Sequence, residues 1–158
     1  MNSIFRSVSL LMGILLLGWS SMTVASGQND QGDVKSIEGV WQTVVTPRIC
    51  STGAAVGPTF PGILMFSSGG TMSGTSTAAS SVYGIWSREN GPRQYAFATV
   101  SLRYDLTGNL IGTRKIHQAV VEDESGDSLT TSGGFQDFDL AGNQVAAGCS
   151  TATGTRYK

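Results

Sequence analysis

Short runs rich in Val, Ile, Thr, Tyr and Phe follow one another along most of this chain, and glycine-containing turns separate them. Within the runs, hydrophobic and polar residues tend to alternate, which is the period of a β-strand, and no longer window carries a hydrophobic stripe at helical spacing. The pattern therefore predicts an all-β domain. The predicted strands are 38–46, 62–67, 71–77, 82–88, 93–104, 109–122, 128–138 and 144–156.

The connections between the predicted strands are mostly short and pair Gly with Asp or Asn, residues that favour tight turns. Short turns join neighbouring strands as hairpins, so we expect an antiparallel meander. Eight such strands bury an apolar face most simply by closing into an up-and-down barrel, which also removes exposed sheet edges. A two-sheet β-sandwich is the alternative fold. The alternation leaves open which face of each strand points inward.

The N-terminal segment has the three parts of a signal peptide. Arg6 supplies a positive charge, residues 8–19 are almost entirely apolar, and small residues follow. The apolar run is shorter than the roughly 20 residues that a membrane-spanning helix needs. We therefore expect residues 1–25 to be a signal peptide, residues 26–36 a flexible polar leader, and residues 37–158 a single domain in the periplasm or outside the cell.

The chain has two cysteines, Cys50 and Cys149, separated by 99 positions. In an exported protein such a pair predicts one disulfide bond, because a redox-active pair usually has much closer spacing. A loop of this length corresponds to about 4–5 kcal/mol of stabilisation in the chain-entropy model. Cys50 belongs to the longest connection, residues 47–61, which we expect to form a loop or lid at one end of the barrel.

Composition excludes several functions. The formal net charge is −1 and the basic residues are scattered, so we expect no nucleic-acid partner. No second uncharged apolar stretch of comparable length follows the N-terminal one, so we expect no membrane insertion after signal cleavage. The one histidine, His117, cannot form a His-rich metal site, and we expect it to face outward or to make a satisfied polar contact. No metal or other cofactor is predicted. The acidic residues from Glu122 to Asp127, together with Asp137 and Asp139, are interpreted as solvated turn residues.

Gly39-Val40-Trp41 on the first predicted strand resembles the G-x-W motif that begins the barrel of lipocalins and their calycin relatives. The resemblance implies that Trp41 lies across the closed end of the barrel and packs against a basic residue near the C-terminus, for which Arg156 is the candidate. The wider layout is similar to small secreted bacterial lipocalin-like proteins of unassigned function. The motifs carrying that similarity are G-I-W at 84–86, D-L-T-G-N at 105–109, G-C at 148–149 and T-G-T-R at 153–156.

The candidate ligand-binding residues are Tyr95, Phe97, Arg103 and Arg114. On the fifth predicted strand Tyr95, Phe97 and Arg103 share one face, and Arg114 lies on the strand that follows. Pointing inward, the two arginines and a tyrosine would create a cationic site suited to a carboxylate or an enolate. Pointing outward, the arginines are ordinary surface residues, and this is the interpretation we prefer.

The resulting functional hypothesis is an exported, non-enzymatic binding module. Its ligand would be a small apolar molecule in the barrel, or a protein partner at the barrel rim. The alternative is an isomerase or cyclase of the allene-oxide-cyclase or dirigent type, whose barrels act mainly by holding a reactive substrate in shape. No catalytic residue is predicted for either hypothesis.

Overall fold

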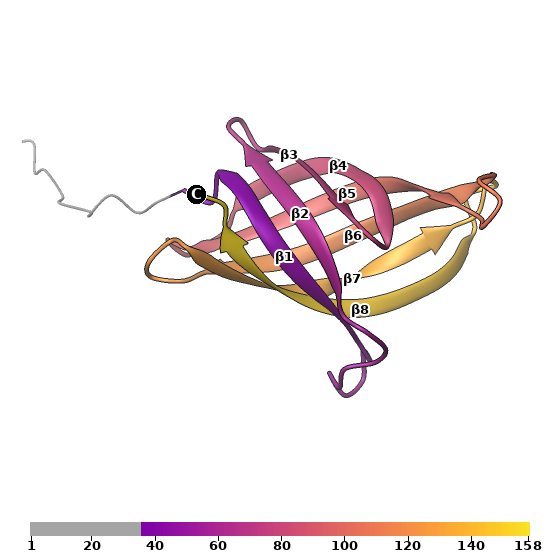
Figure 1. Cartoon of the computed structure of the whole chain (residues 1–158), viewed down its shortest axis with the longest axis horizontal. Coiled ribbons are helices and arrows are strands. Elements are labelled where there is room, and N and C mark those ends of the chain that lie inside the picture. The colour runs from indigo at the N-terminus through magenta and orange to yellow at the C-terminus, as the bar shows by residue number, and fades with distance from the viewer. Residues whose placement is uncertain (1–35) are drawn as a thin grey trace, which may run out of the picture. The chain divides into compact units, whose positions relative to one another are not determined.

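The structure is a computed structural model that describes residues 36–158, apart from the side chain of Ser80, and its strands form one closed sheet (Figure 1). The predicted signal peptide and almost all of the predicted leader lie outside the described residues. Within the described part, no helix is long and apolar enough to span a membrane. The strands are β1 (Gly39–Arg48), β2 (Phe60–Ser67), β3 (Thr71–Ser76), β4 (Ala79–Arg88), β5 (Gln94–Tyr104), β6 (Leu110–Glu122), β7 (Ser128–Phe138) and β8 (Gln144–Arg156).

Every strand pairs antiparallel with the next one along the chain, and β1 also pairs with β8. The closing ladder runs from Trp41 opposite Arg156 to Arg48 opposite Cys149. Closure leaves no free edge in this sheet. The predicted all-β fold, an eight-stranded antiparallel meander barrel, is confirmed, and the two-sheet sandwich is excluded by the β1–β8 pairing.

Three strands extend beyond their predicted ranges. β1 continues through Pro47 to Arg48, β2 begins at Phe60, and β4 begins at Ala79, so the loop after β1 is shorter than expected. Proline interrupts a strand where its missing N–H is needed by a neighbour. Here the last β1–β2 pair is Val45 with Phe60, so Pro47 lies beyond β2 and pairs only with β8. β2 therefore needs no N–H from Pro47, and β1 continues past the proline.

Two hairpin turns at the same end of the barrel, on the right in Figure 1, share one design. In the β5–β6 turn, Asp105 accepts hydrogen bonds from the Thr107 hydroxyl (2.7 Å) and from the Asn109 side chain (3.0 Å). In the β7–β8 turn, Asp139 accepts hydrogen bonds from the backbone and side chain of Asn143. These bonds favour the charged carboxylate, and those from Thr107 and Asn109 lower the pKa of Asp105 to about 2.

The two ends of the barrel are filled differently. The end that holds Trp41, here called the closed end, contains most of the large buried side chains, and Trp41 itself is fully buried. Its indole N–H donates to the carbonyl of Ile37 (2.8 Å), so the segment before β1 is drawn into the same core. The core consists of Ile37, Trp41, Phe66, Met72, Tyr95, Phe97, Val120 and Leu129.

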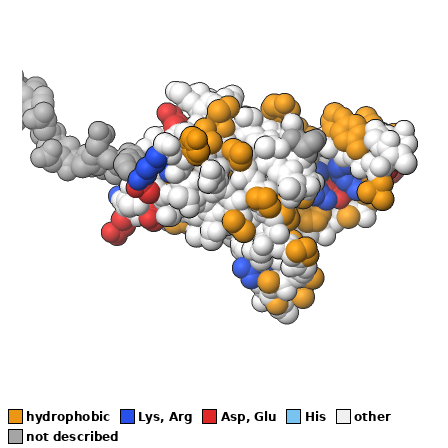
Figure 2. Space-filling view, in the orientation of Figure 1, with side chains coloured by type: hydrophobic (Ala, Val, Ile, Leu, Met, Phe, Trp, Pro, Cys, Tyr) orange, Lys and Arg blue, Asp and Glu red, His pale blue; other side chains and the backbone are white. Residues whose placement is uncertain are grey.

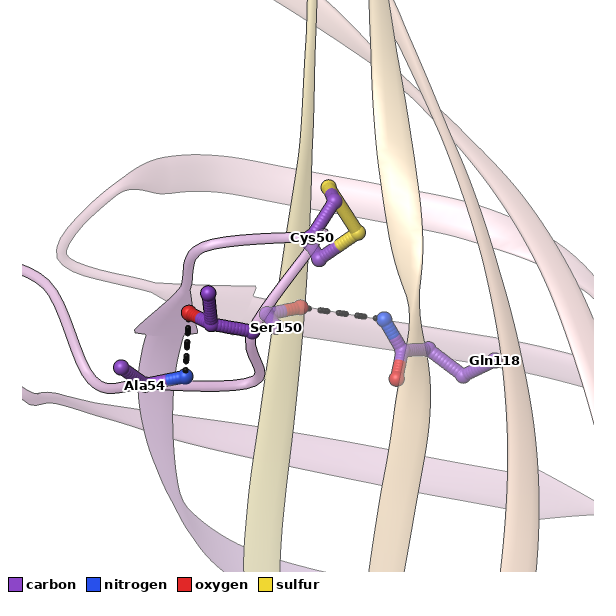
Figure 3. The surroundings of a disulfide bond; sticks show 6 residues. Cys50, Ala54, Gln118 and Ser150 are labelled. Carbon is purple, nitrogen blue, oxygen red and sulfur yellow. Dashed lines mark hydrogen bonds between the residues drawn. A yellow bond between two sulfur atoms is a disulfide. The ribbon is translucent and has the colours of Figure 1, made fainter.

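The opposite end, here called the open end, carries the loop between β1 and β2. This loop projects from the lower side of the barrel in Figure 2 and exposes the hydrophobic side chains of Ile49 and Val56. Cys50 in the loop forms a disulfide bond with Cys149 on β8, with the two Cα atoms 5.1 Å apart (Figure 3). The predicted disulfide is therefore confirmed.

Candidate functional site

A cavity of about 320 Å³ lies inside the barrel between the closed-end core and the open end. All eight strands contribute residues to its wall. The volume is at the lower end of the range found for small-molecule sites, which are typically concave and mostly apolar. The apolar part of the wall includes Val45, Phe60, Leu64, Val82, Phe97 and Ile116.

Small inward-facing residues keep this part of the barrel hollow. Along β8 the inward positions are Ser150, Ala152 and Gly154, and the first two line the cavity. Across the β1–β8 ladder, Ala152 faces Val45 and Gly154 faces Thr43, so short side chains meet short side chains. An eight-stranded barrel is just wide enough either to fill with side chains or to hold one small ligand. Here the closed end is filled and the space toward the open end is not.

Two polar side chains in the cavity wall have atoms with no hydrogen-bond partner among residues 36–158. Gln118 donates from Nε2 to the Ser150 hydroxyl (3.1 Å), a bond that spans from β6 to β8 (Figure 3). Its Oε1 atom and the Thr99 hydroxyl are buried and unpaired. Leaving a buried polar atom unpaired costs about 1–3 kcal/mol, and most such atoms in proteins are satisfied. These two atoms are therefore polar groups of the cavity wall that have no partner within the described residues.

Arg103, Arg114 and Asp137 form what we call the mouth cluster, where the cavity meets the open end. Arg114 makes a bidentate pair with the Asp137 carboxylate, with distances of 2.7 Å from Nε and 2.9 Å from Nη2. The Nε atom of Arg103 lies 3.2 Å from the same carboxylate. The interpretation of both arginines as surface residues is wrong, because their guanidinium groups converge on a carboxylate that is only 5% exposed.

The mouth cluster is held in place and borders a second opening. The Arg114 guanidinium lies 4.3 Å from the centre of the Phe135 ring, and Arg114 lines both the cavity and the opening. Ser101, Arg103 and Tyr104 also line the opening, and the Ser101 hydroxyl is buried without a partner in the described part of the chain. Figure 2 shows basic and acidic side chains together in a hollow toward the right of the barrel.

The closed end has its own buried ion pair. Arg156 lies 4.3 Å from the centre of the Trp41 ring, which is the contact that the family resemblance implied. It also pairs with the Glu122 carboxylate at 2.9 Å. Its remaining hydrogen bonds go to three backbone carbonyl groups, those of Ser36, Glu38 and Gly126.

Two acidic residues at these ion pairs were expected to lie in solvent. The prediction that Glu122 and Asp137 are solvated turn residues is wrong, because both are buried and each is paired with arginine. Both lie on strand positions that face the barrel interior. Asp139, by contrast, is in the β7–β8 turn.

The glycine of the G-x-W motif is explained by the closed-end arginine. Gly39 has a φ of 126°, a conformation that L-residues with a side chain rarely adopt. A Cβ atom there would lie 3.0 Å from Nη1 of Arg156. Gly39, Trp41 and Arg156 therefore form one structural unit that caps the closed end.

Tyr95 belongs to the closed end and does not line the cavity. Its hydroxyl donates to Glu122 (3.4 Å) and accepts from Arg88 (3.3 Å). Burial, followed by the nearby charge of Glu122, raises the pKa of the Tyr95 phenol. The tyrosine is therefore part of the packed core.

The other three candidate ligand-binding residues are brought together. Phe97 and Arg114 line the cavity, and Arg103 lies at its mouth. Sequence reasoning did not select Thr99, Gln118 or Asp137. The sequence did contain a signal for Thr99, because Thr99 shares a strand face with Phe97. It contained one for Asp137 as well, because Asp137 shares a strand face with Phe135 on β7.

His117 lies exposed on the outer face of β6, as expected. No cluster of three or more His, Cys, Asp or Glu residues suited to a metal ion occurs among residues 36–158.

No protein-family model matches this sequence, and no curated protein matches it either. The resemblance to lipocalin-like proteins beyond the barrel architecture therefore stays a prediction.

Proposed function

We propose that this protein is an exported, non-enzymatic binding module that holds a small apolar ligand inside the barrel. The observation that carries the proposal is the cavity of about 320 Å³, whose wall is mostly apolar and contains two buried, unpaired polar atoms. A mostly apolar wall with a few polar anchors is typical of small-molecule sites. The disulfide and the N-terminal signal pattern support export, because disulfides persist in oxidising compartments.

The wall also suggests the character of the ligand. Val45, Leu64 and Ile116 offer hydrophobic contact, and the Thr99 hydroxyl can donate or accept a hydrogen bond. The unpaired Oε1 atom of Gln118 can only accept. Thr99 and Gln118 lie on neighbouring strands, two residues out of register. A largely hydrocarbon molecule that carries a polar group matches this set of contacts.

The test is direct binding of a small amphiphile. Protein expressed from the full chain is examined by native mass spectrometry for a co-purifying ligand, and decanol is then titrated in a thermal-unfolding assay. A ligand at about 100 times its Kd adds about 2.7 kcal/mol to stability, which is enough for a visible shift in Tm. We expect Ala152→Leu, which fills the cavity, to weaken decanol binding at least about tenfold, by roughly 1.4 kcal/mol.

The matched control is Thr153→Leu, which places the same side chain at the neighbouring, outward-facing position of β8. This variant should bind decanol as the unmodified protein does. If no ligand co-purifies and decanol does not shift the Tm, or if Ala152→Leu binds as tightly as Thr153→Leu, the barrel cavity is not the binding site. A protein partner at the rim, where Ile49 and Val56 are exposed, would then be the next hypothesis.

The second candidate function is an isomerase or cyclase. The observation that favours it is that Arg103, Arg114 and Tyr104 line one opening at the end of the cavity. Such a group can stabilise a developing enolate. Recovering each bound compound after incubation and comparing it with the starting material by chromatography distinguishes the two functions, because a binding module returns its ligand unchanged.

A further inference from the structure

We infer that the ligand of this barrel is a monocarboxylic acid whose carboxylate binds at the mouth cluster and whose hydrocarbon part enters the cavity. This inference rests on the proposed ligand-binding function and adds the chemical class and orientation of the ligand. Its basis is a surplus of positive charge and of hydrogen-bond donors at the point where the apolar cavity opens.

The charges in the mouth cluster do not balance. Two guanidinium groups share the single carboxylate of Asp137. Among the described residues that line the opening, Arg103 and Arg114 are the only charged ones. One negative charge is therefore missing for neutrality, which matches a carboxylate better than a doubly charged phosphate.

Hydrogen-bond donors remain after the internal pairs are formed. Arg103 approaches Asp137 through Nε, which leaves the hydrogens of its two terminal nitrogens for other acceptors. The Ser101 hydroxyl is buried and has no partner in the described part of the chain. Ser101 faces Arg114 across the β5–β6 ladder and lies two residues before Arg103 on the same strand face. A carboxylate between these groups would receive charge-assisted hydrogen bonds from at least two side chains.

The mouth cluster is also continuous with the cavity. Arg114 lines both the cavity and the opening, and its guanidinium is fixed by Asp137 and by the Phe135 ring on its face. Inward positions of β5 change from an aromatic residue at 97 through Thr99 and Ser101 to an arginine at 103, so the wall becomes more polar toward the mouth. An acid with a hydrocarbon tail matches this gradient along its whole length.

The experiment compares decanoic acid with decanol, which share a chain length and differ in the head group. Binding of each is measured by calorimetry with protein expressed from the full chain, near neutral pH. We expect the acid to bind at least about tenfold more tightly than the alcohol, since hydrogen bonds to charged groups are the stronger ones. We expect Arg103→Gln to remove this preference by weakening binding of the acid at least about tenfold.

Lys115→Gln is the matched control, because it removes one positive charge from an exposed position on β6 that faces away from the opening. It should leave the preference for the acid intact. Circular dichroism checks that the variants fold, and the acid-to-alcohol comparison in the unmodified protein stands even if Arg103→Gln does not fold. Equal binding of acid and alcohol overturns the inference and leaves the proposed function standing. Binding of neither compound overturns both.

Discussion

At the scale of single residues, both ends of the barrel place arginine beside a buried carboxylate, and the two arrangements differ in how completely the arginine is satisfied. Arg156 pairs with Glu122, stacks on Trp41 and gives its remaining hydrogen bonds to three backbone carbonyl groups. At the mouth, two arginines share Asp137. The closed end is therefore a finished structural unit, and the mouth has donors left for a ligand.

Trp41→Ala tests the structural role of the closed end. Trp41 is fully buried and contacts Arg156, so we expect the variant to lose about 3–5 kcal/mol of unfolding free energy, as for other large buried aromatic residues. Denaturant unfolding followed by circular dichroism measures the change. Tyr83→Ala is the control, because Tyr83 is 64% exposed, and it should change stability much less. Similar midpoints for the two variants would show that Trp41 does not cap the barrel.

At the scale of elements, the backbones of β6 and β7 approach each other closely at Gly133. Gly133 on β7 pairs with Gln118 on β6 and with Ser150 on β8. The Gln118 side chain reaches from one neighbour to the other at this point (Figure 3). A Cβ atom on Gly133 would collide with the backbone carbonyl of His117. Glycine here permits the local strand geometry that brings Gln118 to Ser150.

Gly133→Ala should therefore destabilise the barrel, although it adds only one methyl group. We expect a loss of about 1–3 kcal/mol, the usual cost when an extra methyl group forces a backbone shift. Chemical denaturation measures it. The neighbouring Ser132 is exposed, so Ser132→Ala should stay within about 0.5 kcal/mol of the unmodified protein. A Gly133→Ala variant as stable as Ser132→Ala would mean that β7 and β6 can separate without cost.

At the scale of the whole described molecule, closure of the barrel joins the first strand to the last, and the disulfide reinforces the same junction. Arg48 at the end of β1 pairs with Cys149 on β8, and Cys149 is bonded to Cys50 in the following loop. Cys149 also lines the cavity. The bond thus ties the β1–β2 loop to the wall of the cavity, beside the hydrogen bond from Gln118 to Ser150.

Removing the disulfide should destabilise the protein without changing the fold. The bond closes a separation of 99 residues. The chain-entropy model assigns such a loop about 4–5 kcal/mol. We expect a Cys50→Ser, Cys149→Ser double variant to lose a comparable amount of unfolding free energy, measured by chemical denaturation.

Reductant separates the role of the bond from that of the substitutions. It should lower the stability of the unmodified protein and should not affect the double variant. Intact-mass analysis after alkylation should detect two thiols in the unmodified protein only after reduction. Two reactive thiols in the native protein would contradict the bond.

The sequence by itself determined the fold class, the eight strands, their order and the disulfide. The strands and their order follow from local patterns: the two-residue period predicts a strand, a Gly beside Asp or Asn predicts a turn, and short turns require neighbouring strands to pair. The strands at 128–138 and 144–156 agree with β7 and β8 at both ends. The other predicted strands begin and end within about three residues of the observed ones. The effect of Pro47 on β1 was not predictable, because it depends on which neighbouring strand pairs with the proline.

Only the tertiary structure decided which strand face points inward and which side chains meet there. Alternation is the same whichever face is buried, so the sequence could not distinguish surface arginines from Arg103 and Arg114 in the mouth cluster. Asp137 on β7 lies directly opposite Arg114 on β6, and Arg103 on β5 lies two residues beyond Ser101, the partner of Arg114. No local pattern relates these residues, because they come from three different strands.

Closure of the sheet turns these side chains toward one interior, and the small residues of β8 leave that interior hollow. The cavity and its charged mouth are therefore properties of the closed barrel, since they depend on which distant side chains it brings together and not on any single stretch of the chain.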